Sequence, residues 1–343
     1  MEQAPVVSII IANWNGKEVL ESCLESLYAM TEKNFEIIIV DNGSRDGSVE
    51  MIKSHFSQAI IIENKKNLGF AKANNQGIKA SKGEFILTLN NDTLVEVDFL
   101  DALLLTVKGG SEDVGMWAPK ILSVVEKDII DSVGGLLIYP DGLARGRGRL
   151  EKDQGQFDED VEILMPSACA GLYRKKMLDV IGLFDPDFFA YCEDTDLGLR
   201  AKLAGWRAFS VPKARVFHHY SKTSGAYNLR KAYLIERNRV WVVLKNFPLK
   251  NLLLSPAYTF SRYLTHLYGI KTGKGASARY SEQFSMLSLC GILLRAYGAA
   301  FYKLLPILKK RKKIKEKKLI SNLKFSKLLF RFGMSAKEIG LKD

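Results

Sequence analysis

The chain has 343 residues, of which 47% are hydrophobic and 26% charged, with 27 glycines and only 9 prolines. This length fits about two domains, and the composition excludes a disordered tail, a collagen-like chain and a disulfide scaffold. Charge is divided unevenly along the chain. Residues 1–200 carry 20 Lys and Arg and 33 Asp and Glu, whereas residues 201–343 carry 30 Lys and Arg and 5 Asp and Glu.

The first hundred residues alternate between apolar runs and helical stripes. The runs predict strands at residues 6–11, 35–40, 59–62 and 85–89. The stripes predict helices around Val19–Leu27 and over residues 46–55 and 70–80. Apolar strands joined by helices indicate an α/β fold with a parallel sheet that has helices on both faces. Ligands of such sheets bind at the carboxyl ends of the strands.

The remaining sequence changes character twice. Residues 110–170 predict short strands and a mobile basic loop at 145–149, and a helix is predicted over 193–204, ending at Gly205. Residues 228–330 are helical in pattern, basic and rich in aromatics. We therefore expect a catalytic domain over residues 1–227 and a basic helical region over 228–343.

Small polar, acidic and aromatic residues follow each of the first four predicted strands. Asp41 can accept the ring N–H of a pyrimidine base, on which the Trp14 ring can stack. Asp92, with amide side chains beside it, offers hard oxygen ligands to Mg²⁺ or Mn²⁺. Such residues are also ordinary turn formers. Four of these turns at one sheet edge nevertheless favour a ligand site.

These turns and one later segment resemble the inverting family-2 glycosyltransferases, in particular the rhamnosyltransferase-like branch that builds bacterial cell-surface polysaccharides. The matching segments are VSIIIANWNG, EIIIVDNGSRDGS, NLGFAKANNQGI, FILTLNNDT and GLFDPDFFAYCEDTDLGLRAKLAGW. The resemblance implies a GT-A-type nucleotide-binding sheet. It also implies transfer of a sugar, rhamnose being the leading candidate, from a nucleoside-diphosphate sugar to a lipid-linked or polysaccharide acceptor.

The resemblance also assigns roles to individual residues. It implies that Asp41 binds the base, that Asp92 and His218 hold Mg²⁺ or Mn²⁺, and that Asp194 is the catalytic base. The other residues that we assign to substrate binding are Asn13, Trp14, Asn15, Asn42, Ser44, Asn67, Gly69, Asn75, Asn91, Gly171, Glu193 and Arg200.

Two positions depart from the usual family pattern. Ala12 and Asn13 stand where most members have Pro-Thr, as they do in the rhamnosyltransferase-like branch. Asn90 stands where many relatives have Asp, so Asp92 is the only carboxylate of the metal motif.

Three carboxylates crowd the start of the helix predicted at residues 193–204. Carboxylates there complement the helix dipole by about 0.3–1 kcal/mol each, and Asp196 fits that role because Arg200 follows four residues later. The aromatic residues at 188–191 predict a platform for a sugar ring. Beside it, Asp194 can take the proton of an acceptor hydroxyl, a role that accelerates transfer about 10²–10⁴-fold.

The basic second part predicts an anionic partner. Residues 309–318 hold eight cations and one anion, and they follow an apolar stretch at 284–308 that we expect to be one helix. This composition favours peripheral binding to an anionic membrane, although it also suits RNA or DNA. Because the neighbouring segments are apolar and no nucleic-acid motif is present, we expect a membrane surface and no nucleic acid.

The cysteine pattern and the apolar runs suggest where the protein works. The four cysteines form no C-x-x-C pair, and the N-terminus lacks the basic and apolar regions of a secretory signal. The longest uncharged stretch, residues 3–16, is too short to span a bilayer. We therefore expect a cytoplasmic protein, peripheral on the inner face of the cell membrane.

Two other functions remain open at this stage. A sugar-phosphate nucleotidyltransferase would need a Gly-rich, Arg-containing loop after the first strand, where the chain has Asn13–Gly16. A nucleic-acid-binding protein would leave the acidic first part unexplained. A dinucleotide oxidoreductase is excluded more simply, because no G-x-G-x-x-G follows the first strand.

Overall fold

The computed structural model describes residues 4–219 and 227–342. By its contacts the chain divides into two compact units that interleave in the sequence. The first unit comprises Met1–Leu136, Gly146–Phe189 and Trp206–Ser224, and the second comprises Leu137–Arg145, Ala190–Gly205 and Gly225–Asp343. A single boundary between residues 227 and 228 does not describe this interleaving, because two earlier segments belong to the second unit.

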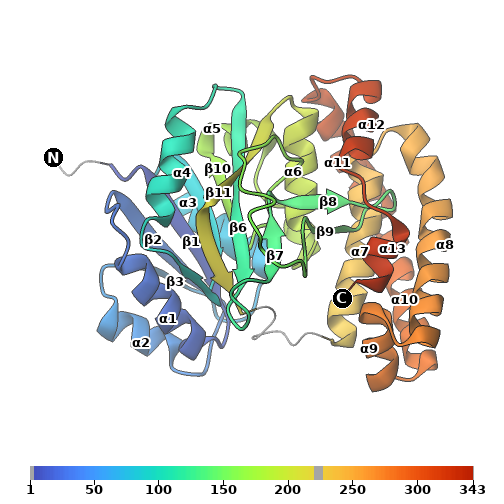
Figure 1. Cartoon of the computed structure of the whole chain (residues 1–343), viewed down its shortest axis with the longest axis horizontal. Helices are drawn as coiled ribbons and strands as arrows, with labels where there is room; N and C mark the ends of the chain where they lie inside the picture. Colours follow the sequence, from blue (N-terminus) through green and yellow to red (C-terminus); the bar gives the residue numbers. More distant parts are fainter. Residues whose placement is uncertain (1–3, 220–226, 343) are drawn as a thin grey trace. The chain divides into compact units, whose positions relative to one another are not determined.

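The four predicted strands are confirmed and lie side by side in the first unit. They are β1 (Val7–Asn13), β2 (Phe35–Asp41), β3 (Ile60–Glu63) and β4 (Phe85–Asn90), paired in parallel in the order β3-β2-β1-β4. The register aligns the ends of the strands, with Asn13 opposite Asp41 and Ala12 opposite Asn90. The polar residues that follow these strands therefore gather at one edge of the sheet (Figure 1).

The rest of the sheet, beyond the four strands that we predicted to be parallel, is mixed. The added strands are β5 (Thr93–Val95), β6 (Val114–Ser123), β7 (Ile130–Val133), β10 (Ala170–Arg174) and β11 (Arg207–His218). The order continues as β4-β10-β6-β11-β5, with β7 beside β6. β10 enters the sheet at the carboxyl end of β4, opposite Leu89, and therefore runs antiparallel to both of its neighbours.

Helices cover both faces of the parallel strands, as predicted. The helices of this unit are α1 (Lys17–Tyr28), α2 (Ser48–His55), α3 (Phe70–Ala80), α4 (Phe99–Lys108) and α5 (Lys175–Ile181). Ile9 and Ile11 share one core with α1, α2 and α4. On the opposite face α3 lies so close to β1 that a Cβ at Gly77 would come 2.4 Å from Ile10. Alternate residues of β1 thus bury against helices on opposite sides.

A short hairpin carries the basic loop that we predicted to be mobile. It is formed by β8 (Leu136–Ile138) and β9 (Ala144–Gly146). Two of the arginines in and after it are held by the first unit. Arg149 forms an ion pair with Asp131, and the Arg147 guanidinium lies 4.7 Å from the centre of the Phe157 ring.

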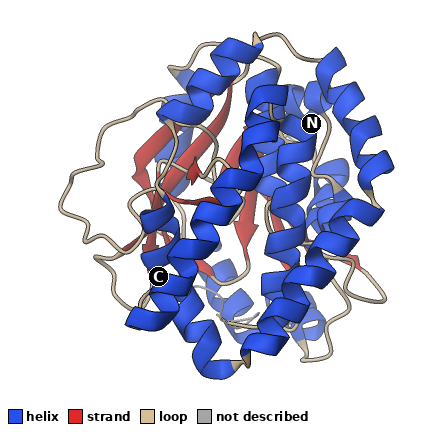
Figure 2. Ribbon diagram, turned by 90° about the vertical axis from the view of Figure 1, so that its right-hand side faces the viewer, coloured by secondary structure: helices blue, strands red, loops and turns tan. Residues whose placement is uncertain are grey.

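The second unit is helical, as predicted (Figure 2). Its helices are α6 (Glu193–Leu203), α7 (Leu229–Asn246), α8 (Leu249–Thr272), α9 (Gly275–Gln283), α10 (Met286–Tyr302), α11 (Leu304–Glu316), α12 (Asn322–Arg331) and α13 (Ala336–Leu341). α7 packs against α6, α8, α10 and α11. The apolar stretch at 284–308 is not one helix, because Lys303 ends α10 and precedes α11. No single helix of the described residues is long and apolar enough to cross a membrane, whereas α9 and α10 meet the criterion together but are bent by 115°.

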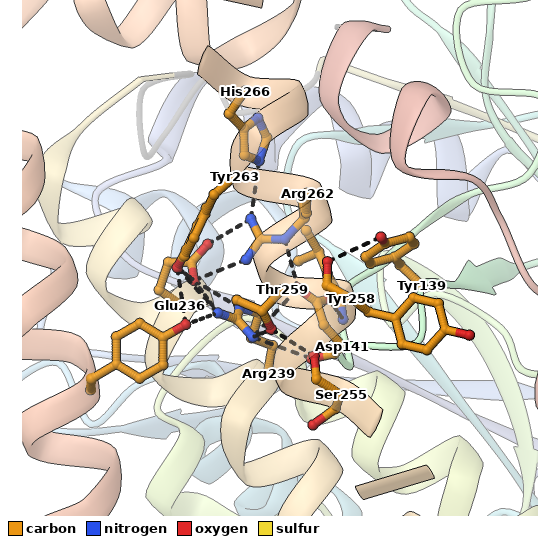
Figure 3. A network of polar contacts seen from close by, with 12 residues as sticks. Tyr139, Asp141, Glu236, Arg239, Ser255, Tyr258, Thr259, Arg262, Tyr263 and His266 are labelled. Carbon is orange, nitrogen blue, oxygen red and sulfur yellow. Dashed lines mark hydrogen bonds and ion pairs between the residues drawn. The ribbon is translucent and has the colours of Figure 1, made fainter. Parts of the chain in front are cut away.

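Buried charges join α7, α8 and the hairpin tip inside the second unit (Figure 3). Arg262 Nε donates to Asp141 Oδ2 over 2.7 Å, and Arg239 Nε donates to Glu236 Oε2 over 2.7 Å. The Arg262 guanidinium also reaches Glu236, and the Tyr263 hydroxyl donates to the same carboxylate. Two cations therefore face two anions, which is the condition under which charges can be buried.

Candidate functional site

The carboxylate of Asp41 is fixed at the carboxyl end of β2. Its Oδ1 accepts from the backbone N–H groups of Gly43 and Ser44 over 2.9 and 2.8 Å, and its Oδ2 accepts from Asn13 Nδ2 over 3.0 Å. The residue is 1% exposed. A carboxylate can accept about four hydrogen bonds, and these contacts from the described residues use three. One position on Oδ2 therefore suits the N–H of a base.

Asn13 links Asp41 to the turn after β4, because its Oδ1 accepts from Asn91 Nδ2 over 2.8 Å. The neighbouring turn is held by the Ser44 hydroxyl, which accepts from the backbone N–H of Asn15 over 2.8 Å. Trp14 stands between these residues in the sequence and is 40% exposed. The structure thus brings together five of the predicted residues and leaves the indole accessible for stacking.

A second set of predicted residues lies beside β2 and α3. The Asn42 Oδ1 accepts from Asn64 Nδ2 over 3.0 Å, and Asn64 pairs in turn with Gln76. Asn67 Oδ1 accepts from the N–H of Gly69 over 2.9 Å. Gly69 has a φ of 88°, and a Cβ there would come 2.6 Å from Phe189. Only glycine fits this position, which orders the turn that starts α3.

Two predicted substrate-binding residues have structural contacts inside the first unit. Asn75 donates to the Phe184 carbonyl over 2.7 Å and accepts from the Phe184 N–H over 3.1 Å. Gly171 is buried within β10, where a Cβ would lie 2.7 Å from the Tyr173 hydroxyl. These contacts explain why asparagine stands at position 75 and glycine at position 171. A contact with substrate stays a prediction for each residue.

The two predicted metal ligands lie next to each other. β5 pairs with β11 so that Thr93 lies opposite His218, and this register places His218 Nε2 3.3 Å from Asp92 Oδ1. His218 Nδ1 lies 2.8 Å from Asp131 Oδ2 on its other side. Burial lowers the pKa of His218, but contacts with Cys169, Asp131 and Asp92 outweigh it and raise this pKa well above its usual value.

The spacing of Asp92 and His218 fits a shared divalent cation once the His218 Nε2 has lost its proton. Two ligands about 2.1 Å from one ion and at a right angle lie about 3 Å apart, close to the observed separation. A carboxylate oxygen suits Mg²⁺ and Mn²⁺. Within residues 4–219 and 227–342, no three or more His, Cys, Asp or Glu side chains form a metal site by themselves. An ion at this pair would need further ligands from substrate or water.

Sequence reasoning missed Asp131, which holds the second ring nitrogen of His218. A histidine that binds a metal typically has a carboxylate at its other nitrogen, which fixes the orientation of the ring. An acidic residue within the apolar run at 129–133 was the available signal. Its partner is 87 residues away in the sequence, so no local pattern could pair the two.

The predicted carboxylates of α6 lie in the second unit and are largely buried. Asp194 accepts from the backbone N–H of the next residue, Thr195, over 2.7 Å. Asp196 is held by Arg200 Nε over 2.9 Å and by Lys245 Nζ over 2.8 Å. The expected pair of Asp196 with Arg200 is therefore present. This ion pair already engages the Arg200 guanidinium, so a contact of Arg200 with substrate stays a prediction.

Burial and neighbouring charges separate the carboxylates of α6. Burial raises the pKa of Glu193 well above its usual value, and Asp194 and Asp196 add to this shift. Burial also acts on Asp196, but Lys245 and Arg200 outweigh it and lower its pKa. Glu193 Oε2 is buried without a hydrogen-bond partner among the described residues. The helix start thus combines a carboxyl group with a raised pKa, Glu193, and one with a lowered pKa, Asp196.

Comparisons with known proteins identify the family. The glycosyl transferase family 2 model matches residues 8–182, just over half of the chain. An uncharacterised glycosyltransferase of Rickettsia typhi is 30% identical over 67% of this chain and 70% of its own length. The N-acetylglucosaminyl-diphospho-decaprenol L-rhamnosyltransferase of Mycobacterium tuberculosis is 27% identical over 64% of this chain and 78% of its own. In two other relatives, from Sinorhizobium fredii and Bacillus subtilis, the match covers only 26% and 31% of their length.

Solved glycosyltransferases share the fold at low sequence identity. S. aureus TarS in complex with UDP-GlcNAc has a TM-score of 0.52 and 16% identity, over 95% of this chain and 92% of that one. GalNAc-T7 with UDP, GalNAc and Mn²⁺ has a TM-score of 0.58 and 17% identity, over 71% of this chain and 48% of that one. The mixed sheet with its helices is the GT-A fold. With the match over half of its length, the chain belongs to glycosyl transferase family 2.

Proposed function

We propose that the protein is an inverting, metal-dependent glycosyltransferase that moves a sugar from a nucleoside diphosphate to a hydroxyl of a lipid-linked or polysaccharide acceptor. The observation that carries the proposal is the fixed carboxylate of Asp41, which keeps one acceptor position for a base at the sheet edge that also holds Asp92. Rhamnose is the leading candidate sugar, a proposal that rests on the resemblance of the first motif, with Asn13, to the rhamnosyltransferase-like branch.

In this proposal the residues of the first unit bind the donor. Asp41 accepts the ring N–H of the base, and the exposed Trp14 ring stacks on it. Asn13 and Ser44 orient these two groups through the hydrogen bonds described above. Asp92 and His218 would hold Mg²⁺ or Mn²⁺, which would supply positive charge to the departing diphosphate when bound.

Asp194 acts as the general base. It takes the proton of the acceptor hydroxyl while the oxygen bonds to the anomeric carbon and the bond to the nucleoside diphosphate breaks. A single displacement of this kind inverts the anomeric configuration. Burial raises the pKa of Glu193 well above its usual value, which favours a neutral carboxyl group that can donate a hydrogen bond to substrate and does not compete for that proton.

The second unit supplies a surface for an anionic membrane. The cations of residues 309–318 supply charge on α11 and after it. Large apolar side chains are exposed on two other helices of this unit, including Leu253 and Phe260 on α8 and Leu287 and Leu294 on α10, each at least 64% exposed. Exposed apolar side chains together with cations suit a protein that lies on a bilayer without crossing it. We propose that the protein works there, on the cytoplasmic side.

A panel of nucleotide sugars tests the proposed reaction. The purified protein is incubated with UDP-, GDP-, dTDP- and CMP-linked sugars, including a nucleotide-linked rhamnose, and release of the free nucleotide is measured. We expect one nucleoside diphosphate to be released, and the Asp41→Ala variant to lose donor affinity. Asp179→Ala, which changes an exposed aspartate of α5, should behave as wild type. No release from any member, or equal activity of Asp41→Ala, would contradict the proposal.

A further inference from the structure

The two residues before the carboxylates of α6 have an unusual backbone. Tyr191 and Cys192 have φ values of 70° and 64°, and neither is a glycine. The left-handed region is sterically unfavourable for a residue that carries a Cβ. Cys192 is also the N-cap of α6, and its side chain makes no capping hydrogen bond. This turn therefore needs support from elsewhere in the second unit.

Asn238 of α7 supplies that support. Its Nδ2 donates to the carbonyl oxygens of Ala190 and Tyr191 over 2.8 and 2.7 Å, which uses both hydrogens of the amide. Its Oδ1 accepts from Arg237 Nε over 2.9 Å. Asn238 is 0% exposed. A buried amide that bonds two successive carbonyls constrains the path of the chain between them.

The other side of the carboxylate pair is also anchored to α7. Lys245 Nζ and Asn246 Nδ2 lie 2.8 and 2.9 Å from Asp196 Oδ1, in the first turn of α6. Glu193 and Asp194 therefore stand between two attachments to the same helix. The region predicted as a separate basic element thus fixes the helix start that carries the proposed base.

We propose that Asn238 is a positioning residue for glycosyl transfer, which holds the left-handed turn before Glu193 and so presents Asp194 in its reactive orientation. The inference rests on the proposed role of Asp194. Without the amide, two half-buried carbonyls lose these hydrogen bonds. The turn then lacks the contacts that offset its strain and relaxes. A displacement of about 1 Å at a catalytic group can slow a reaction about 100-fold.

The kinetic test uses Asn238→Ala in the full chain. We expect kcat to fall at least about tenfold while KM for the nucleotide sugar stays within about twofold, since the proposed donor-binding residues belong to the first unit. Trp241→Phe is the matched control, because it removes a buried hydrogen bond from α7 to the Ala300 carbonyl of α10. Its kcat should stay near that of wild type.

Variants of the turn keep the test valid if Asn238→Ala folds poorly. Cys192→Val puts a β-branched residue at a positive φ and should lower kcat in the same way, whereas Cys192→Gly should not. Adding Cys192→Gly to Asn238→Ala should restore part of kcat, because glycine adopts this backbone without strain. A purely structural loss would not be rescued by glycine at the turn.

Hydrogen exchange of the amides at residues 190–196 tests the turn independently of activity. We expect faster exchange in Asn238→Ala and unchanged exchange in Trp241→Phe. Two results would overturn this inference and leave the proposed function standing. One is unchanged exchange in Asn238→Ala, and the other is a normal kcat of Asn238→Ala when Asp194→Asn is inactive. Full activity of Asp194→Asn would overturn the base assignment and this inference with it.

Discussion

His218 Nδ1 lies 2.8 Å from Asp131 Oδ2, while Nε2 of the same ring faces Asp92 over 3.3 Å. The imidazole is therefore held between two carboxylates, Asp92 in the turn before β5 and Asp131 in β7. Arg149 forms an ion pair with Asp131 and fixes that carboxylate in turn. Such an arrangement orients the Nε2 atom toward whatever Asp92 binds.

Asp131→Ala should weaken binding of a divalent cation although Asp131 is not a proposed ligand. The imidazole loses the partner that fixes its orientation, which typically lowers metal affinity about 10–100-fold. Free Mn²⁺, measured by electron paramagnetic resonance during titration of the protein, gives the affinity directly. Asp92→Ala should lower it further.

Asp128→Ala is the control for this experiment. Asp128 is an exposed residue before β7 that pairs with Lys152, so its removal also deletes an ion pair. Its Mn²⁺ affinity should equal that of wild type. Equal affinity of Asp131→Ala and wild type would show that Asp131 does not support a metal ligand.

The sequence predicted the first four strands and the first three helices because each buries a regular face. The stripe at Val19, Leu20, Cys23, Leu24 and Leu27 is the buried face of α1. The residues after these strands could be grouped because parallel strands end at one edge. Asp41, Asn13 and Ser44 were found in this way without knowledge of their hydrogen bonds.

The same reasoning failed where partners come from distant segments. α6 buries ten of its eleven residues, including Asp196, Arg200 and Lys202, and an amphipathic stripe cannot predict that. Asp196 is buried at little cost because Lys245, about fifty residues later, faces it. β10 likewise joins the sheet from a distant part of the chain, so the local sequence pattern could not predict its antiparallel direction.

Asp194→Asn should keep nucleotide-sugar binding and abolish transfer. The amide preserves the shape of the side chain but cannot take the acceptor proton. A general base contributes about 10²–10⁴-fold, so kcat should fall by at least 100-fold while the donor KM changes little. Steady-state kinetics with a matched Asp179→Asn variant would measure both. Transfer within tenfold of wild type would exclude Asp194 as the base.

His266→Gln should reduce the loss of stability at acidic pH. Burial and, after it, Arg262, whose Nη1 lies 3.0 Å from the His266 Nε2, lower the pKa of His266 to about 4 against the opposing effect of Glu236 and Asp141. Between about pH 4 and about pH 6.5, His266 binds a proton in the unfolded chain but not in the folded chain. Stability therefore falls as pH falls, by about 2 kcal/mol between pH 7 and pH 5.

Denaturant unfolding at these two pH values would measure the effect. The difference between pH 7 and pH 5 should be smaller in His266→Gln than in wild type. His55→Gln, which changes an exposed histidine of the first unit, should leave that difference unchanged. The same difference in His266→Gln and wild type would mean that His266 does not contribute to acid unfolding.

The membrane surface is best tested by charge, since deletion of residues 309–343 would remove the buried Phe325, Leu329 and Ile339. Changing the exposed Lys309, Lys312, Lys313 and Lys315 to Gln should weaken binding to anionic vesicles at least about tenfold. The upper bound is about 1 kcal/mol per cation, and salt screening lowers it. The matched control changes four exposed lysines of the first unit, at positions 72, 79, 82 and 108.

Cosedimentation with anionic vesicles at rising salt would measure the effect. At low salt the tail variant should bind less than the control variant, and at high salt the two should bind equally. Equal vesicle binding by both would place the attraction elsewhere, and tight, salt-sensitive RNA binding by the wild type would favour a nucleic-acid partner.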